Sequence, residues 1–287
     1  MRDEIRSFVV AAAFLAVAAV VVVSGLRGQE AEPLDIQQVK DGLYVITGPG
    51  GNVGVRVTGD GVVLVDNKFE RNHDAIMGHV QSVTDQPVTY VMGTHHHGDH
   101  MGGNPLFSTH AQIIGHQNNR DNMIRGDQPS PPTLVFADET SIFVGEAEVR
   151  AHHFGQGHTN GDAIIYFPDL GTIHGGDLLH GIAPFIDYGN GGSSKAWITT
   201  LEGALELEWD TAIPGHGDLM TRADVEAFRD QMVSVRARMT ELIGEGVTRE
   251  QAADKIRTSD LSWTMAPDGL FMRRSIEGFY DELAAER

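Results

Sequence analysis

The 287-residue chain contains no cysteine. This absence excludes a disulfide framework and any thiolate chemistry, whether as a nucleophile or as a metal ligand. Basic residues are also scarce, with 21 Lys and Arg against 40 Asp and Glu and a formal net charge of -19. An acidic surface repels phosphate backbones. We therefore expect no nucleic-acid partner and favour a small neutral or cationic molecule as the substrate, and the oligomeric state is left open.

A long apolar run lies near the N-terminus. Residues 8–23 are uninterrupted apolar residues between Arg6 and a segment that contains Ser and Gly. This pattern is typical of an export signal, and its length is also close to the lower limit for a membrane span. A buried helix of the domain is disfavoured because the run has no polar face. We expect residues 1–28 to be a signal peptide or membrane anchor, and residues 29–287 to form a domain facing a periplasm-like space.

The remaining chain alternates strand-like and helical segments. Short β-branched runs bounded by Gly-rich turns predict strands over residues 43–47, 53–57, 62–65, 88–92, 133–136, 141–144, 147–151, 163–167, 172–174 and 211–213. Apolar periodicity and capping patterns predict helices over residues 72–83, 195–207, 221–243 and 270–283, and one after a Thr248/Gln251 capping box. This order favours a layered α/β arrangement with helices on the outer faces of the sheets.

Histidine is abundant, with 14 residues, and it is clustered. The strand predicted at 88–92 runs directly into Thr94-His95-His96-His97-Gly98-Asp99-His100. At strand spacing His95 and His97 point the same way, and two imidazoles on one side form half of a tetrahedral zinc site. Gly98 allows a tight turn, so that Asp99 and His100 face the same cavity. The spacing favours metal ligands over a solvated histidine patch.

Three later segments each place one ligand-capable residue in a Gly-rich turn beside a predicted strand. They are Gly157-His158-Thr159, Gly175-Gly176-Asp177 and Pro214-Gly215-His216-Gly217. Each is weak alone, but together with the histidine cluster they resemble the metallo-β-lactamase superfamily in order and local context, from about residue 43 to about residue 223.

The resemblance implies a fold, a ligand set and a cofactor. The fold is a four-layered αβ/βα sandwich, of the α/β (α+β) class, with the metals at one edge between the two sheets. The cofactor is a pair of Zn2+ ions, with iron or manganese as alternatives. The resemblance assigns the first metal to His95, His97 and His158, the second to Asp99, His100 and His216, and the bridging position to Asp177.

The expected activity is hydrolysis of a cyclic amide, ester or similar acyl bond. Zinc lowers the pKa of bound water to about 7, so a hydroxide that bridges the metals is the candidate nucleophile. Asp99 orients this hydroxide, and the second metal receives the leaving group. The β-lactamases of this superfamily have a thiolate or no carboxylate at the bridging position. The carboxylate of Asp177 instead resembles that of glyoxalase II and the lactonases. The substrate therefore stays open between a β-lactam, a lactone and a thioester.

Two other functions were weighed against hydrolysis. A mononuclear iron persulfide dioxygenase would use only the first three histidines and a carboxylate, and the intact second set argues against it. A non-catalytic binding module would be expected to have lost some of the metal ligands, whereas all seven candidate ligands are present in this chain.

Further residues are candidates for roles around the metals. Tyr188 is a candidate oxyanion donor in a substrate loop over residues 183–194, with a plain surface loop as the alternative. His180 is a candidate for lining the pocket, with a core histidine as the alternative. Residues 48–52 are expected to form a second mobile substrate loop, and Thr159 and Asn160 to support the ligands by hydrogen bonds.

Overall fold

The computed structural model describes residues 33–181, 183–266 and 269–287. The signal or anchor expected over residues 1–28 lies outside these residues. Residues Leu34–Arg287 form one compact unit. Within the described residues, no helix has both the length and the apolar character needed to cross a membrane.

The first sheet has seven strands in chain order, from β1 to β7. The first four pair antiparallel, and β4, β5, β6 and β7 pair parallel. Parallel strands place their carboxyl ends at one edge, so the segments after β4 and β5 come together there. The bounds are β1 (Asp35–Lys40), β2 (Leu43–Thr47), β3 (Val53–Thr58), β4 (Gly61–Val65), β5 (Val88–Gly93), β6 (Gln112–His116) and β7 (Leu134–Phe136).

The second sheet has six strands in the order β13-β12-β11-β10-β9-β8. Only β11 and β12 pair parallel, and in their register His180 lies opposite His216. This parallel pair therefore brings two histidines from distant parts of the chain side by side. The bounds are β8 (Glu139–Val144), β9 (Ala147–His152), β10 (Ile164–Phe167), β11 (Thr172–His180), β12 (Thr211–His216) and β13 (Met220–Thr221).

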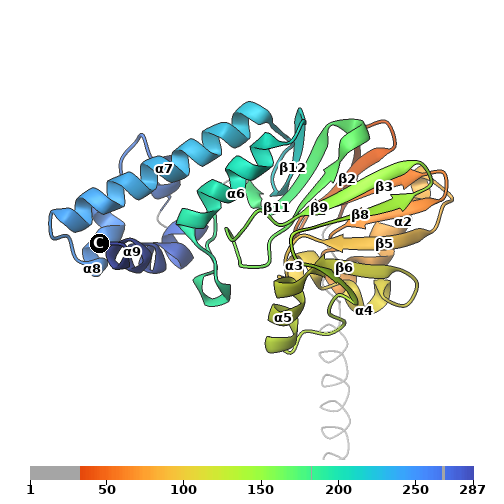
Figure 1. The fold of residues 1–287 in the computed structure, drawn as a ribbon, viewed down its shortest axis with the longest axis horizontal. Coiled ribbons are helices and arrows are strands. Elements are labelled where there is room, and N and C mark those ends of the chain that lie inside the picture. The colour runs from red at the N-terminus through yellow and green to blue at the C-terminus, as the bar shows by residue number, and fades with distance from the viewer. Residues whose placement is uncertain (1–32, 182, 267–268) are drawn as a thin grey trace, which may run out of the picture. The chain divides into compact units, whose positions relative to one another are not determined.

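Helices cover the outer face of each sheet, as Figure 1 shows. The helices are α2 (His73–Val83), α3 (Gly98–Met101), α4 (Asn104–Phe107), α5 (Gln117–Arg125), α6 (Ser194–Glu206), α7 (Arg222–Gly244), α8 (Arg249–Lys255) and α9 (Ile276–Ala285), with a π-helical turn, η5 (Phe271–Ser275), before α9. One apolar cluster lies between the sheets, a second lies under α2, α4 and α5, and a third lies between the second sheet and α6 to α9. The order helix, sheet, sheet, helix confirms the four layers that the resemblance implies.

Most predicted elements are confirmed, and several bounds are corrected. Thr221 and Asp224 form the capping box that begins α7. By contrast, β1, β6 and α5 were not predicted. The strand predicted to end at residue 174 continues to His180, and the strand predicted to end at residue 213 continues to His216. Asp177 and His216 therefore lie on strands rather than in turns.

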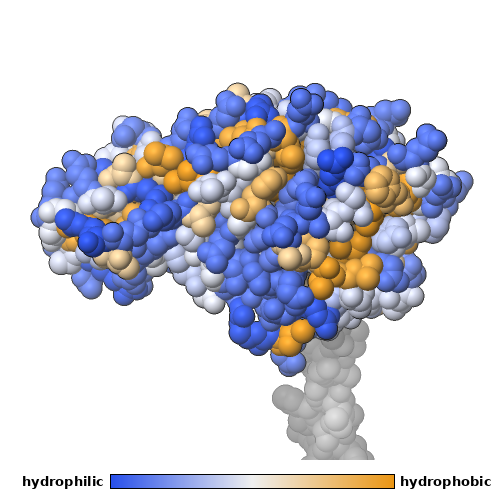
Figure 2. Space-filling view, in the orientation of Figure 1, coloured by the Kyte–Doolittle hydropathy of each residue, from blue (hydrophilic) through white to orange (hydrophobic). Residues whose placement is uncertain are grey.

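The face of the domain shown in Figure 2 is mainly hydrophilic, with hydrophobic residues in separate patches. Acidic residues outnumber basic ones about two to one over the chain.

Candidate metal centre

Three histidine nitrogens converge at the carboxyl end of β5. His97 Nδ1 lies 3.1 Å from His95 Nε2 and 2.9 Å from His158 Nε2. His95 and His97 come from the bend after β5, and His158 comes from the loop between β9 and β10. These nitrogens and an oxygen of Asp177 all lie within 4.8 Å of one another. The structure thus brings together the residues predicted to hold the first metal.

A second group lies beside the first. His216 Nε2 lies 3.3 Å from His100 Nε2 and 3.3 Å from Asp99 Oδ2. Asp99 and His100 lie in α3, and His216 is the last residue of β12. These three residues also form a cluster of ligand-capable atoms within 4.8 Å. This group corresponds to the residues predicted for the second metal.

Asp177 lies between the two groups, and each of its carboxylate oxygens faces one of them. Oδ1 lies 3.2 Å from His100 Nε2 and 3.4 Å from His216 Nε2. Oδ2 lies 3.7 Å from His158 Nε2 and 4.0 Å from His95 Nε2. Oδ1 is buried and accepts no well-formed hydrogen bond from the described residues. A buried carboxylate oxygen without a donor calls for a cation, so the donor set fits two bridged metal ions.

Neighbouring groups fix which nitrogen of each histidine points inward. His97 Nε2 donates to Asp187 Oδ2 at 2.9 Å, and His158 Nδ1 donates to the Phe185 carbonyl oxygen at 2.6 Å. His100 Nδ1 donates to Asp66 Oδ2 at 2.7 Å. In His97 and His158 the other nitrogen therefore keeps its lone pair, and that nitrogen points into the cluster. Burial alone would lower the pKa of His100, but the carboxylates of Asp177 and Asp66 raise it well above its ordinary value, so a metal ion would have to displace the proton from His100 Nε2.

The charge states suit coordination. Burial, reinforced by the neighbouring imidazoles, lowers the pKa of His95 well below its ordinary value, and burial lowers that of His158 to about 3. Burial alone would raise the pKa of Asp177, but the surrounding imidazoles, His100 first, hold it well below the ordinary value. Burial likewise opposes ionisation of Asp99, yet the hydrogen bond from His216 brings its pKa to about 2. Neutral imidazoles and ionised carboxylates are the forms that bind metals.

Asp66 is a functional residue that the sequence analysis missed. It follows β4 directly, is fully buried, and also accepts hydrogen bonds from Thr94 N and Thr94 Oγ1, each at 2.8 Å. Thr94 Oγ1 in turn lies 3.1 Å from His95 Nδ1, so one carboxylate orients a ligand of each metal group. The position of Asp66 directly after a predicted strand could have indicated this role. β4 and β5 pair parallel, so the residues that follow them meet at the same edge of the sheet.

We expect Asp66→Asn to weaken zinc binding about 10–100-fold, the usual effect of losing an outer partner of a metal ligand. The amide would offer an N–H to His100 Nδ1, which favours the wrong tautomer. Competition with a fluorescent zinc chelator measures the affinity. Asp121→Asn, at a carboxylate on the exposed side of α5 that accepts only from Gln117, is the control and should bind zinc as the wild type does. Equal affinities in all three proteins would contradict the role of Asp66.

His180 lies at the wall of the cleft described below and is also nearly buried. Its ring stacks on His216 with centroids 5.0 Å apart, and Nε2 lies 4.0 Å from Asp177 Oδ2. The side chain is almost fully buried, and Nδ1 has no partner among the described residues. Burial lowers its pKa, so the ring is neutral and has one N–H to offer.

The prediction for Tyr188 is wrong. Its hydroxyl donates to Glu282 Oε2 at 2.8 Å, and a Cβ on Gly278 of α9 would collide with its ring. Burial, reinforced by Glu282, raises the pKa of Tyr188 well above its ordinary value. The side chain therefore attaches its loop to α9. Its hydroxyl proton is used in the hydrogen bond to Glu282 and is not free to stabilise an oxyanion.

Residues 48–52 are not a free loop either. The ammonium group of Lys68, a fully buried residue, donates to the Gly51 carbonyl oxygen at 2.7 Å. Its other two N–H groups face the carbonyl oxygens of Gly48, Pro49 and Gly50, which lie 3.3–3.5 Å away. Gly51 N also donates to the Asp99 carbonyl oxygen at 3.0 Å. Burial lowers the pKa of Lys68 to about 8, which leaves it mainly charged at neutral pH. This segment is a support for the second ligand group.

Thr159 and Asn160 shape the loop after His158 and do not contact the ligand side chains. Thr159 N and Oγ1 donate to Asp162, and Asn160 Oδ1 accepts from Asn122 Nδ2 at 2.9 Å. Thr159 thus supports the ligand loop through the backbone.

The two groups open into a cleft of about 600 Å³. Arg274 is the one basic residue among those that line it, and its guanidinium lies 5.6 Å from the centre of the Phe185 ring. The lining residues are Phe69, His97, Gly98, Asp99, Asp177, His180, Phe185, His216, Leu270 and Arg274. The centre is therefore accessible to a small molecule, with one cation at its rim.

Comparisons with known proteins identify the family of the chain. A model of the metallo-beta-lactamase superfamily matches residues 46–216. The chain is 26% identical over 161 residues to metallo-beta-lactamase type 2 of Elizabethkingia meningoseptica, covering 53% of this chain and 65% of that protein. It therefore spans less than two thirds of the length of that relative. It is also 26% identical over 252 residues to the 2,4-dinitroanisole O-demethylase subunit alpha of Nocardioides sp. (strain JS1661), covering 82% of this chain and 74% of that protein.

Solved structures show the same fold. The metallo-beta-lactamase from Pontibacter korlensis has a TM-score of 0.63 at 17% identity, covering 69% of this chain and 98% of that chain. The DIM-1 metallo-beta-lactamase has a TM-score of 0.64 at 18% identity, covering 71% of this chain and 99% of that chain. All seven predicted ligands fall within the residues that the family model covers.

Proposed function

The chain belongs to the metallo-β-lactamase superfamily, and from this premise we propose that it is a hydrolase with two zinc ions that opens a cyclic amide, an ester or a similar acyl bond. The observation that carries the proposal is the position of Asp177, with one oxygen toward each ligand group. A mononuclear iron dioxygenase would have no use for the second group. The close approach of Asp99, His100 and His216 favours two ions over one.

The proposed ligand sets are supported by the way the candidate ligands are grouped. His95, His97 and His158 would hold the first ion, and Asp99, His100 and His216 the second, with Asp177 shared. Zinc, when bound, supplies a Lewis acid for the attacked carbonyl and a water whose pKa is about 7.

The protein groups then position the reactants. Asp99 lines the cleft and is ionised at neutral pH, so its carboxylate can accept a hydrogen bond from the attacking water and orient it. His180 offers an N–H from the wall next to His216. Arg274, at the rim, suits a substrate that carries a carboxylate away from the reacting bond.

The location of the enzyme is part of the proposal. Residues 8–23 form an apolar run of the kind that directs export, so we propose a protein that acts outside the cytoplasm, either released or anchored at its N-terminus. Mass spectrometry of the chain recovered from the cell envelope would show whether residues 1–28 remain attached. Recovery of the intact chain from the cytoplasm alone would refute export.

The proposal is tested on the full-length zinc-loaded protein. We expect two zinc ions per chain by elemental analysis and turnover of at least one of a chromogenic β-lactam, a lactone and a thioester. Asp99→Ala should lower kcat about 10²–10⁴-fold, because it removes a ligand of the second ion and the group that orients the attacking water. Asp210→Ala, an exposed carboxylate paired with Lys40, is the control and should leave kcat unchanged. One iron per chain, or no turnover by a protein that holds two zinc ions, would overturn the proposal.

A further inference from the structure

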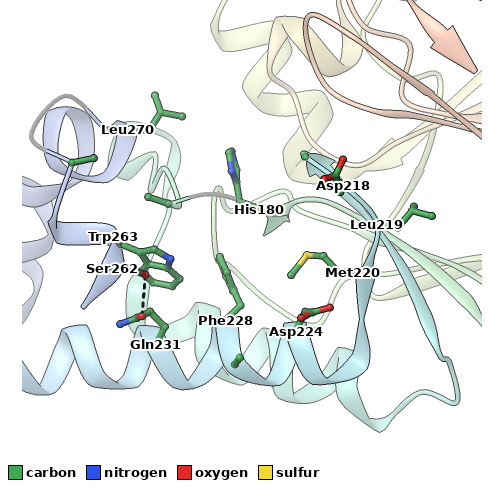
Figure 3. A pocket seen from close by; sticks show the side chains of 16 residues that line it. His180, Asp218, Leu219, Met220, Asp224, Phe228, Gln231, Ser262, Trp263 and Leu270 are labelled. Atoms are coloured by element: carbon green, nitrogen blue, oxygen red, sulfur yellow. Dashed lines mark hydrogen bonds between the residues drawn. The ribbon is translucent and has the colours of Figure 1, made fainter. Parts of the chain in front are cut away.

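A second cavity of about 910 Å³ adjoins the metal cleft. His180 and Leu270 line both spaces, so the cavity continues from the cleft rather than lying apart from it. Figure 3 shows His180 between Leu270 and Trp263 on one side and Asp218 and Met220 on the other. A molecule bound at the metals could therefore extend past His180 into this space.

The walls of the cavity are mainly apolar and come largely from the C-terminal helices. α7 supplies Ala227 and Phe228, and the segment after α8 supplies Trp263. The Phe228 and Trp263 rings pack at a centroid distance of 4.8 Å, inclined by 53°. Met220, from β13, faces them from the other side, as Figure 3 shows. Two aromatic rings and a thioether make a wall that suits a flat apolar group.

The polar groups of the cavity select against an anion. Among the described residues that line it there is no Lys or Arg. Two carboxylates, Asp218 and Asp224, are present, and the Asp224 side chain is used in the capping box of α7. Gln231 accepts from Ser262 Oγ at 3.3 Å. An uncharged group is therefore the expected occupant, because an anion would be desolvated beside carboxylates without a cation.

The position of the cavity identifies which part of a substrate reaches it. Gly217 and Asp218, which line it, directly follow His216, and His180 stacks on the His216 ring. The cavity thus opens beside the second ligand group. In the reaction expected from the sequence, the metal held by this group receives the leaving group of the substrate.

We propose that this cavity binds an uncharged aromatic group on the leaving-group side of the scissile acyl bond, an inference that rests on the proposed hydrolase function. Hydrolysis of such a substrate joins the oxygen of water to the acyl carbon and breaks the bond from that carbon to the leaving oxygen or nitrogen. The proton from water passes to the leaving atom. For an aryl ester the products are a carboxylic acid and a phenol.

The first arm of the test measures binding without turnover. 4-tert-Butylphenol is titrated calorimetrically into the full-length zinc-loaded protein. Ala227→Trp places an indole into the cavity from an exposed helix position, so it should raise the Kd at least about tenfold. Ala237→Trp makes the same change at an exposed position of α7 that does not line the cavity, and the Kd should stay unchanged. No binding to the wild type, or an equal Kd in both variants, would overturn the inference.

The second arm measures selectivity. The ratio of kcat/KM for 4-tert-butylphenyl acetate to that for methyl acetate should fall about tenfold in Ala227→Trp and stay the same in Ala237→Trp. Using one pair of esters cancels their different intrinsic reactivity. An unchanged ratio in Ala227→Trp overturns the inference and leaves the hydrolase function standing. If no acyl substrate at all is turned over, the hydrolase function fails, and a leaving-group site fails with it even where the phenol binds.

Discussion

Asp177→Asn is expected to reduce the zinc content from two ions per chain to one or fewer and to lower kcat/KM by more than about 100-fold. Asparagine keeps the shape of the side chain but replaces one anionic oxygen by an NH2 group, so the residue can no longer offer an anionic oxygen to each ligand group. Loss of an outer partner alone costs about 10–100-fold. Loss of a shared ligand should cost more. Elemental analysis and steady-state kinetics on the same preparation measure both effects.

Asp66→Asn is the comparison for this substitution. Asp66 is also buried and contacts His100 Nδ1, on the side of the ring away from the cluster. The Asp66→Asn variant should therefore retain more zinc and more activity than the Asp177→Asn variant. The reverse order, or two zinc ions with full activity in Asp177→Asn, would show that Asp177 is not a shared ligand.

The candidate ligands could be found in the sequence because they are concentrated in short segments. Four of the seven lie within six residues after one buried strand, where alternation of side chains and a single glycine define their directions. The structure brings these four together with the other three. Their binding of metal remains a prediction.

The bounds of β11 and β12 were misjudged because glycine was interpreted as a turn residue. Gly175 and Gly176 lie inside β11, which is buried along its whole length. A Cβ on Gly175 would collide with Leu179, and one on Gly176 would collide with Thr94. Here glycine permits close approach of the backbone to another segment, which is its other meaning within a strand.

Residues whose roles depend on distant segments could not be predicted. α5 was missed because Gln117–Arg125 is almost wholly polar, and its buried side includes Asn119 and Asn122. Asp187 reaches His97 across 90 residues of sequence. The role of Tyr188 depends on Glu282 in α9, which no local pattern reports.

Trp197→Ala is expected to lower the free energy of unfolding by about 3–5 kcal/mol, the usual cost of removing a buried tryptophan. The side chain is fully buried in α6, and its indole N–H donates to the Leu178 carbonyl oxygen at 3.0 Å. Its ring lies against Gly157 and, edge-on, 6.2 Å from His158. Urea unfolding followed by circular dichroism measures the loss.

Trp197 also lies beside two ligands, because Leu178 follows Asp177 and Gly157 precedes His158. Its removal should therefore weaken zinc binding about 10–100-fold in addition to destabilising the fold. Trp209→Ala is the matched control, since Trp209 is buried in the same apolar cluster but donates to the Ala204 carbonyl oxygen of α6. We expect it to lose similar stability and keep the wild-type zinc affinity. Equal zinc affinities in the two variants would mean that the C-terminal core supports the fold without positioning the metal ligands.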